Sequence, residues 1–120
     1  MIYYGKPLSL NSMYPTNRQG RRFLTTEGKA YKEAIKRLCV DLRVNEGRLR
    51  FSYMVYGPIL TKQGNISKTA GDIDGWCKAL MDACCEAAGV DDSSVIEIHA
   101  KKTNATEWRV EFSLVNLSND

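Results

Sequence analysis

The fold is decided by one stretch of the chain, GDIDGWCKALMDACCEAAG (Gly71–Gly89). From Ile73 onward its apolar side chains recur at the three- and four-residue spacing of an α-helix. The apolar positions are Ile73, Trp76, Cys77, Leu80, Met81, Cys84 and Ala88. Along the opposite side, four residues apart, stand Asp74, Lys78 and Asp82. Because Gly89 suits a left-handed C-terminal cap, we predict an amphipathic helix over residues 74–88.

Shorter patterns on either side of this helix predict the strands of a sheet. Residues 1–4 form a short apolar segment, and we expect a strand there. Residues 49–56 alternate in the manner of a strand and are rich in aromatic and β-branched side chains. Residues 95–102 and 107–115 are expected to be two further strands, joined into a hairpin by a turn at residues 103–106.

Another helix is expected between the first two strands. Thr25 or Thr26 can cap its start, and the helix is expected to stop near Val44. Its predicted buried stripe consists of Ala30, Ala34, Leu38 and Leu42. The order β-α-β-α-β-β predicts an α+β (or α/β) fold in which two main helices pack on a mixed β-sheet. At 120 residues, the chain is expected to be a single domain over residues 1–120.

Two long polar segments, residues 9–24 and 61–71, interrupt these elements. Loops of this length in compact domains often carry function. The first loop contains Arg18, Arg21 and Arg22. The second contains Lys62 and Lys68.

The charge is divided unevenly along the chain, although the formal net charge is only +3. Residues 1–50 hold eleven Lys or Arg against four Asp or Glu, whereas residues 51–120 hold six against ten. A basic half beside an acidic half suits a metal-using phosphodiesterase, which must hold both a polyanion and cations. Ordinary solvated surfaces give the same kind of pattern, so the charge alone leaves the function open.

The composition is that of a globular domain, with 43% hydrophobic and 26% charged residues. No apolar run approaches the roughly 18 to 20 residues that a membrane span needs. The N-terminus also lacks the apolar run of a secretory signal. We therefore expect a cytoplasmic protein without a membrane partner.

The cysteines are interpreted as reduced core residues. Cys39, Cys77, Cys84 and Cys85 include no C-x-x-C pair, and the sequence offers one histidine, His99, to help them bind zinc. Adjacent Cys84 and Cys85 would also point to different sides of a helix. His99 is expected to be a sheet residue without a catalytic role, since no partner for acid–base chemistry is evident.

Carboxylates flank the predicted helix on both sides. Asp72 and Asp74 precede it, and Asp91 and Asp92 follow it. Magnesium prefers oxygen ligands and keeps several waters, so one to three aspartates with phosphate oxygens suffice for a site. A helix of about 15 residues separates its ends by some 20 Å. Spacing alone therefore leaves open whether Asp92 meets the first pair.

Structural roles explain the same residues. Asp72 or Asp74 can cap the helix, and residues 91–94 can form an ordinary turn. A calcium loop is disfavoured because the twelfth position counted from Asp72 is Ala83 instead of an acidic residue. Lys78, one turn after Asp74, can ion-pair with that residue or approach a phosphate.

Two parts of the chain carry a more specific pattern. The first combines Asp72-Ile73-Asp74, Lys78, Asp82 and Gly89-Val90-Asp91-Asp92. The second, nearer the N-terminus, combines Pro7, Asn11, Tyr14, Arg21-Arg22 and Thr26-Glu27-Gly28-Lys29-Ala30-Tyr31. Together they resemble the RusA family of Holliday junction resolvases over nearly the whole chain. Gly75 departs from the family's usual Asn, and residues 89–92 are one residue shorter than in some relatives.

The resemblance implies an enzyme of bacteria or their phages: a homodimeric crossover junction endodeoxyribonuclease. Such an enzyme uses Mg²⁺, with Mn²⁺ as a substitute, to resolve branched four-way DNA by paired symmetric nicks in recombination and repair. The resemblance implies that Asp72, Asp74 and Asp92 are the metal ligands and catalytic residues, with Asp91 left as the alternative to Asp92. Lys78 is implied as the catalytic basic residue.

Basic residues in several segments are candidates for contacts with DNA phosphates. They are Arg18, Arg21, Arg22, Lys62, Lys68, Lys78, Lys101 and Lys102. Three aromatic residues, Tyr3, Tyr14 and Phe23, are candidates to wedge into an opened junction, with a buried or interface role as the alternative. The competing functions are a non-catalytic dimer that binds branched DNA and a structural dimerisation domain without affinity for DNA.

Overall fold

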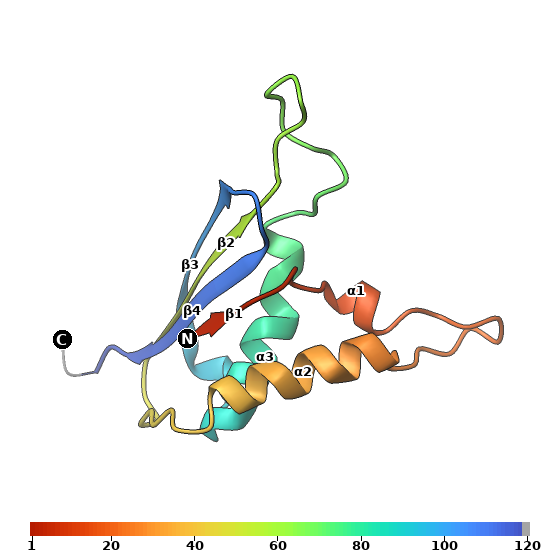
Figure 1. Cartoon of the computed structure of the whole chain (residues 1–120). Helices are drawn as coiled ribbons and strands as arrows, with labels where there is room; N and C mark the ends of the chain where they lie inside the picture. Colours follow the sequence, from red (N-terminus) through yellow and green to blue (C-terminus); the bar gives the residue numbers. More distant parts are fainter. Residues whose placement is uncertain (119–120) are drawn as a thin grey trace.

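A computed structural model describes residues 1–118 as one sheet with helices packed on it (Figure 1). The strands are β1 (Ile2–Tyr3), β2 (Leu49–Gly57), β3 (Val95–Asn104) and β4 (Arg109–Asn116). The α-helices are α1 (Leu10–Met13), α2 (Thr26–Leu38) and α3 (Cys77–Ala88). Two 3₁₀ turns, η1 (Asp74–Trp76) and η2 (Asp92–Ser94), flank α3. This arrangement confirms the predicted α+β fold with a mixed sheet.

The four strands lie in the order β1-β4-β2-β3. β2 pairs in parallel with β3 and antiparallel with β4, and β4 pairs antiparallel with β1. The helices cover one face of this sheet and leave the other open (Figure 1). The alternating burial of β2 agrees with this arrangement, because Leu49, Phe51, Tyr53 and Val55 are buried beneath the helices.

The predicted hairpin between the last two strands is wrong. β4 lies between β1 and β2, and β3 lies on the far side of β2. The connecting residues cross the end of β2, where the Ala105 N–H donates to the Gly57 carbonyl at 2.8 Å. Burial explains the order: β4 buries Val110, Phe112 and Leu114 and takes a central position, whereas β3 is largely exposed and takes the edge.

The earlier helix, α2, differs from its prediction in length and in its buried face. It ends at Leu38 instead of near Val44. The expected buried stripe is also wrong, because Ala30 is exposed and Leu38 is 40% exposed. The buried face instead carries Gly28, Tyr31 and Ile35, followed by Cys39 after the helix. Gly28 permits this face to dock closely, since a Cβ there would lie 2.9 Å from the Cβ of Met13.

The helical stretch that ends at Gly89 is confirmed, with a 3₁₀ turn as its first three residues and Gly89 as its left-handed cap at φ 73°. Its core-facing residues include Trp76, Leu80, Met81 and Cys84. The cysteines of the described chain are free thiols, as expected. Cys39, Cys84 and Cys85 are buried, and Cys77 is half-buried. None of the described helices is long and apolar enough to cross a membrane.

Two projecting loops extend away from the body (Figure 1). In the first, the segment predicted as one loop contains the short helix α1, capped by the Ser9 side chain, which accepts from the Ser12 N–H. A bridge between Thr16 and Arg22 then closes the arginine loop, which we define as residues 14–25. In the second, a bridge between Leu60 and Ile66 closes the lysine loop, which we define as residues 58–70.

Candidate active site

The start of α3 is fixed by contacts beneath the first carboxylate pair. The Tyr53 hydroxyl donates to the Ile73 carbonyl at 2.6 Å. The Trp76 ring packs against Gly71, which has a φ of 123° and would bring a Cβ within 2.4 Å of that ring. Asp72 and Asp74 alternate with half-buried Ile73 and are both exposed. The loop therefore anchors its apolar side chains and presents both carboxylates to solvent.

The second carboxylate pair lies where the chain turns back after α3. Asp91 caps η2, its side chain accepting from the Ser93 N–H at 2.9 Å. Asp92 turns the other way, and its Oδ2 lies 3.0 Å from Lys78 Nζ. The same ammonium lies 3.0 Å from Asp82 Oδ1. Lys78 thus joins two carboxylates that are ten positions apart in the sequence.

The three charges shift one another's protonation. The hydrogen bond from Lys78 holds the pKa of Asp92 below its ordinary value. Partial burial raises the pKa of Asp82 above its ordinary value, although Lys78 opposes that shift. The bonds to Asp92 and then Asp82 raise the pKa of Lys78. Lys78 is therefore a fixed cation at neutral pH, suited to holding charge and unsuited to donating a proton.

The structure distributes the predicted ligands over two places. Asp72 and Asp74 stand at the start of α3, while Asp92 lies against Lys78 and Asp82. Within residues 1–118, no three His, Cys, Asp or Glu side chains are grouped closely enough to hold a metal ion. Asp82 lies in the cluster with Lys78 and Asp92, although its residue type alone predicts no role for it. Its position four residues after Lys78 was the signal that could have identified it.

The chemistry of these donors suits a hard divalent cation. Asp72, Asp74 and Asp92 offer carboxylate oxygens. Magnesium is commonly bound by one or two carboxylates together with waters and substrate phosphates. A pair of exposed aspartates meets that requirement once a phosphodiester is present, so the residues fit such an ion.

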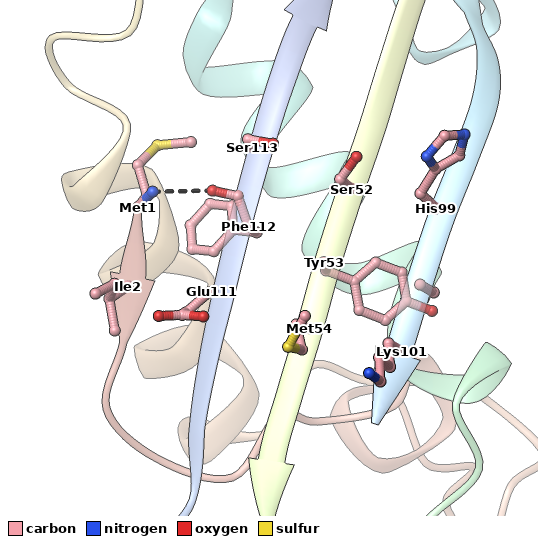
Figure 2. Close-up of a pocket in the computed structure, with 11 residues that line it drawn as sticks. Met1, Ile2, Ser52, Tyr53, Met54, His99, Lys101, Glu111, Phe112 and Ser113 are labelled. Carbon is pink, nitrogen blue, oxygen red and sulfur yellow. Dashed lines mark hydrogen bonds between the residues drawn. The ribbon is translucent and has the colours of Figure 1, made fainter. Parts of the chain in front are cut away.

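The predicted DNA-contacting residues fall into three groups. The first lies on the two projecting loops: Arg18, Arg21, Arg22, Lys62 and Lys68. The second lies beside the carboxylates, where Lys102 Nζ donates to the Gly71 carbonyl at 3.2 Å and Lys78 stands on α3. The third is Lys101, which lines a hollow on the open face of the sheet (Figure 2).

Arg22 differs from the other two arginines of the arginine loop. Its Nε donates to the Tyr14 carbonyl at 3.1 Å, and its Nη2 donates to Asn11 Oδ1 at 3.3 Å. Arg22 therefore braces the base of the loop. Arg18 and Arg21 are exposed near the tip.

The aromatic candidates have different surroundings. Tyr3 packs edge-on against Tyr31, with ring centroids 5.1 Å apart. Tyr14 is half-buried at the base of the arginine loop, and Phe23 is 46% exposed on that loop. His99 lines the same open-face hollow as Lys101. Of the three aromatic rings, Phe23 is the one best placed to meet a ligand.

An open carboxylate pair beside projecting basic loops has the composition of a metal-assisted phosphodiesterase. A family model described as "Endodeoxyribonuclease RusA" matches residues 5–114. The chain belongs to this family. A comparison with curated proteins gave no significant match.

Membership defines the chemistry in outline. The chain is an endodeoxyribonuclease of a family that acts on Holliday junctions and generally depends on divalent metal. The expected resemblance to the RusA family is thereby confirmed.

The two glycines around the first carboxylate pair provide a test of the site's geometry. Gly71→Ala is expected to destabilise the fold by about 1–3 kcal/mol, because the new methyl group strains a positive φ and meets the Trp76 ring. Gly75→Ala is the control, since a Cβ there meets only Asp72 Cβ at 4.0 Å. Urea unfolding would measure both variants. Equal stabilities would contradict the role given to the Gly71–Trp76 contact.

Proposed function

We propose that this protein is a Mg²⁺-dependent endonuclease that resolves four-way DNA junctions by paired symmetric nicks, as a homodimer in the cytoplasm of a bacterial or phage-infected cell. The observation that carries the proposal is the exposed pair Asp72 and Asp74, held at the start of α3 in a chain of the RusA family. The donor chemistry and the basic loops support it. Mn²⁺ is the expected substitute, since it accepts the same oxygen ligands.

Asp72 and Asp74 would hold the ion, and Asp92 would complete its protein ligands. A bound divalent ion activates water and neutralises charge on the leaving oxygen of a phosphodiester. Asp92 Oδ2 lies 3.0 Å from the Lys78 ammonium, and this carboxylate would exchange that contact for the ion. We therefore assign the Lys78–Asp92 pair to the resting protein.

Asp82 is proposed as a positioning residue for Lys78. It holds the same ammonium at 3.0 Å, so Lys78 would keep one anionic partner if Asp92 held the ion. Lys78 then remains on the exposed line of α3, where its charge can meet a DNA phosphate. Both side chains are partly exposed, so the pair contributes little to stability and its value lies in placement.

DNA is proposed to lie over Asp72 and Asp74, between the arginine loop and the lysine loop. Arg18 and Arg21 on the arginine loop, with Lys62 and Lys68 on the lysine loop, would contact phosphates on either side of the cut strand. Lys102, bonded to the Gly71 carbonyl, adds a cation beside the carboxylates. A non-catalytic dimer that binds branched DNA is the alternative, and it predicts binding without cleavage under any divalent ion.

The first prediction separates catalysis from binding. Asp72→Asn is expected to lower the cleavage rate on a synthetic four-way junction by on the order of a thousandfold, because the ion loses a charged ligand. Junction affinity should change little. Excess EDTA should stop the wild-type protein, and added Mg²⁺ should restore it. If wild type and Asp72→Asn nick equally, the activity is not this protein's.

The second prediction tests Asp82 through its coupling to Lys78. Asp82→Asn should lower cleavage about tenfold in the wild-type background, as expected for a residue that orients another. In a Lys78→Met background the same change should have little further effect, because the group that Asp82 positions is gone.

Glu86→Gln provides the matched control for the second prediction. It removes an equal charge one turn further along α3, from a carboxylate that pairs with Lys32 and Lys36. It should leave cleavage nearly unchanged. An equal loss from Asp82→Asn with and without Lys78 would show that Asp82 acts on its own. That result would contradict the positioning role.

The third prediction concerns the arginine loop. Replacing Arg18 and Arg21 by alanine should reduce the slope of log K against log salt for junction binding by about 1.8, because each phosphate that the protein no longer neutralises lowers it by roughly 0.9. Arg43→Ala, in the segment that follows α2, should leave the slope unchanged. An unchanged slope in the double variant would exclude the loop from the DNA interface.

A further inference from the structure

The face of the sheet opposite the helices contains a hollow of about 460 Å³. Figure 2 looks onto it, with Ile2 and Phe112 toward one side, Met54 near the middle and Lys101 toward the other. No helix or loop of the described chain covers this face (Figure 1). A two-layer protein with one uncovered sheet face and a partly apolar hollow in it offers a surface for association.

Strand pairing fixes which charges stand beside the hollow. Met54 on β2 pairs with Lys101 on β3 and with Glu111 on β4. Because neighbouring strands are about 4.8 Å apart, Lys101 and Glu111 stand roughly 10 Å apart on either side of Met54. One lateral row across the sheet therefore has a cation at one end and an anion at the other.

The other charges of this face already have partners. Arg50 pairs with Glu97 at 3.0 Å, and the Arg109 guanidinium stacks on the Tyr56 ring at 3.7 Å. Within residues 1–118, Lys101 and Glu111 form no ion pair. They are the two complementary charges that the fold leaves available for an external partner.

We propose that this open sheet face is the surface through which two copies of the chain pack, with Lys101 of each copy paired to Glu111 of the other. The inference rests on the homodimer of the proposed function and assigns its interface. A two-fold axis parallel to β2 and above Met54 exchanges the two sides of the row, so each Lys101 lies over a Glu111 of the second copy.

The dimensions suit this packing. Two sheets packed face to face lie about 10 Å apart, a gap that a lysine and a glutamate reaching from opposite sides can close. An axis along the strands keeps the strand directions of the two sheets aligned, which is a common packing of sheet on sheet. Met54 then faces its own copy, and the helices and projecting loops remain on the outside.

Charge reversal provides the test, with the mass measured by sedimentation over a concentration series. Lys101→Glu and Glu111→Lys should each weaken dimerisation on the order of a hundredfold, because symmetry creates two like-charge contacts at once. The double variant, Lys101→Glu with Glu111→Lys, should recover dimerisation to within about threefold of wild type. Recovery would also show that the fold tolerates substitution at both positions, and far-UV circular dichroism of each single variant would check its fold.

Lys62→Glu on the lysine loop is the matched control, and it should dimerise as wild type does.

A wild-type mass of one 13.5 kDa chain would overturn both the homodimer and this interface. A wild-type dimer unaffected by either reversal, or not recovered in the double variant, would overturn the interface alone. Weaker junction binding by Lys101→Glu with an intact dimer would mean that the face binds DNA, and would also overturn it. Junction cleavage is measured in a separate assay, so a failure of the nuclease proposal can be told apart from a failure of the proposed interface.

Discussion

The packing of the helical stretch 74–88 against β2 is the constraint on which the rest of the structure depends. Leu80 and Cys84 on the helix and Leu49 and Phe51 on the strand are fully buried in one core. Burying side chains of this size stabilises a fold by about 1.5–3 kcal/mol each, far more than an exposed ion pair does. Burial of the apolar side therefore fixes the rotation of the helix about its own axis. This rotation determines where the carboxylates on the opposite side point.

That constraint explains why the polar site can be built from weak interactions. Asp74, Lys78 and Asp82 follow one line on the outer side of the helix because Trp76, Leu80 and Met81 between them are buried in the core. The left-handed turn at Gly89 then reverses the chain, so that Asp92 meets the same line from outside the helix. Contacts of about 3 Å between exposed groups exchange readily, and exchange is what a site needs if an ion and a phosphate must enter it.

Features that depend on a local sequence pattern were predicted correctly. Features that depend on which elements take a given place in the sheet or core were not. The helix up to Gly89 followed from its periodicity, and the alternation of β2 was equally plain. The hairpin was predicted because residues 95–102 and 107–115 are adjacent in sequence. β4, in which Val110, Phe112 and Leu114 alternate into the core, instead lies between β1 and β2.

The stripe of α2 failed for a related reason, since Gly28 carries no hydrophobic signal and yet sets which face can approach α1. Of the site, the residue types and the line Asp74–Lys78–Asp82 were evident from spacing. The return of Asp92 to Lys78 was not, because it depends on the direction of one turn after α3.

In this fold the basic and acidic halves of the sequence contribute different elements. Part of the basic N-terminal half forms the arginine loop, whereas the acidic half supplies the helix and turns that carry the carboxylates. Some charges of the two halves pair, as Lys32 and Lys36 do with Glu86. Within residues 1–118, Arg18 and Arg21 on the arginine loop form no ion pair, so their charge is available to a polyanion. On the open sheet face the cations Arg50, Lys101 and Arg109 stand with the anions Glu97 and Glu111, so most of the charge cancels. A face on which most charges cancel attracts a polyanion less than a basic loop does, and this difference favours the proposed assignment of DNA to the loops and of the second copy to the sheet.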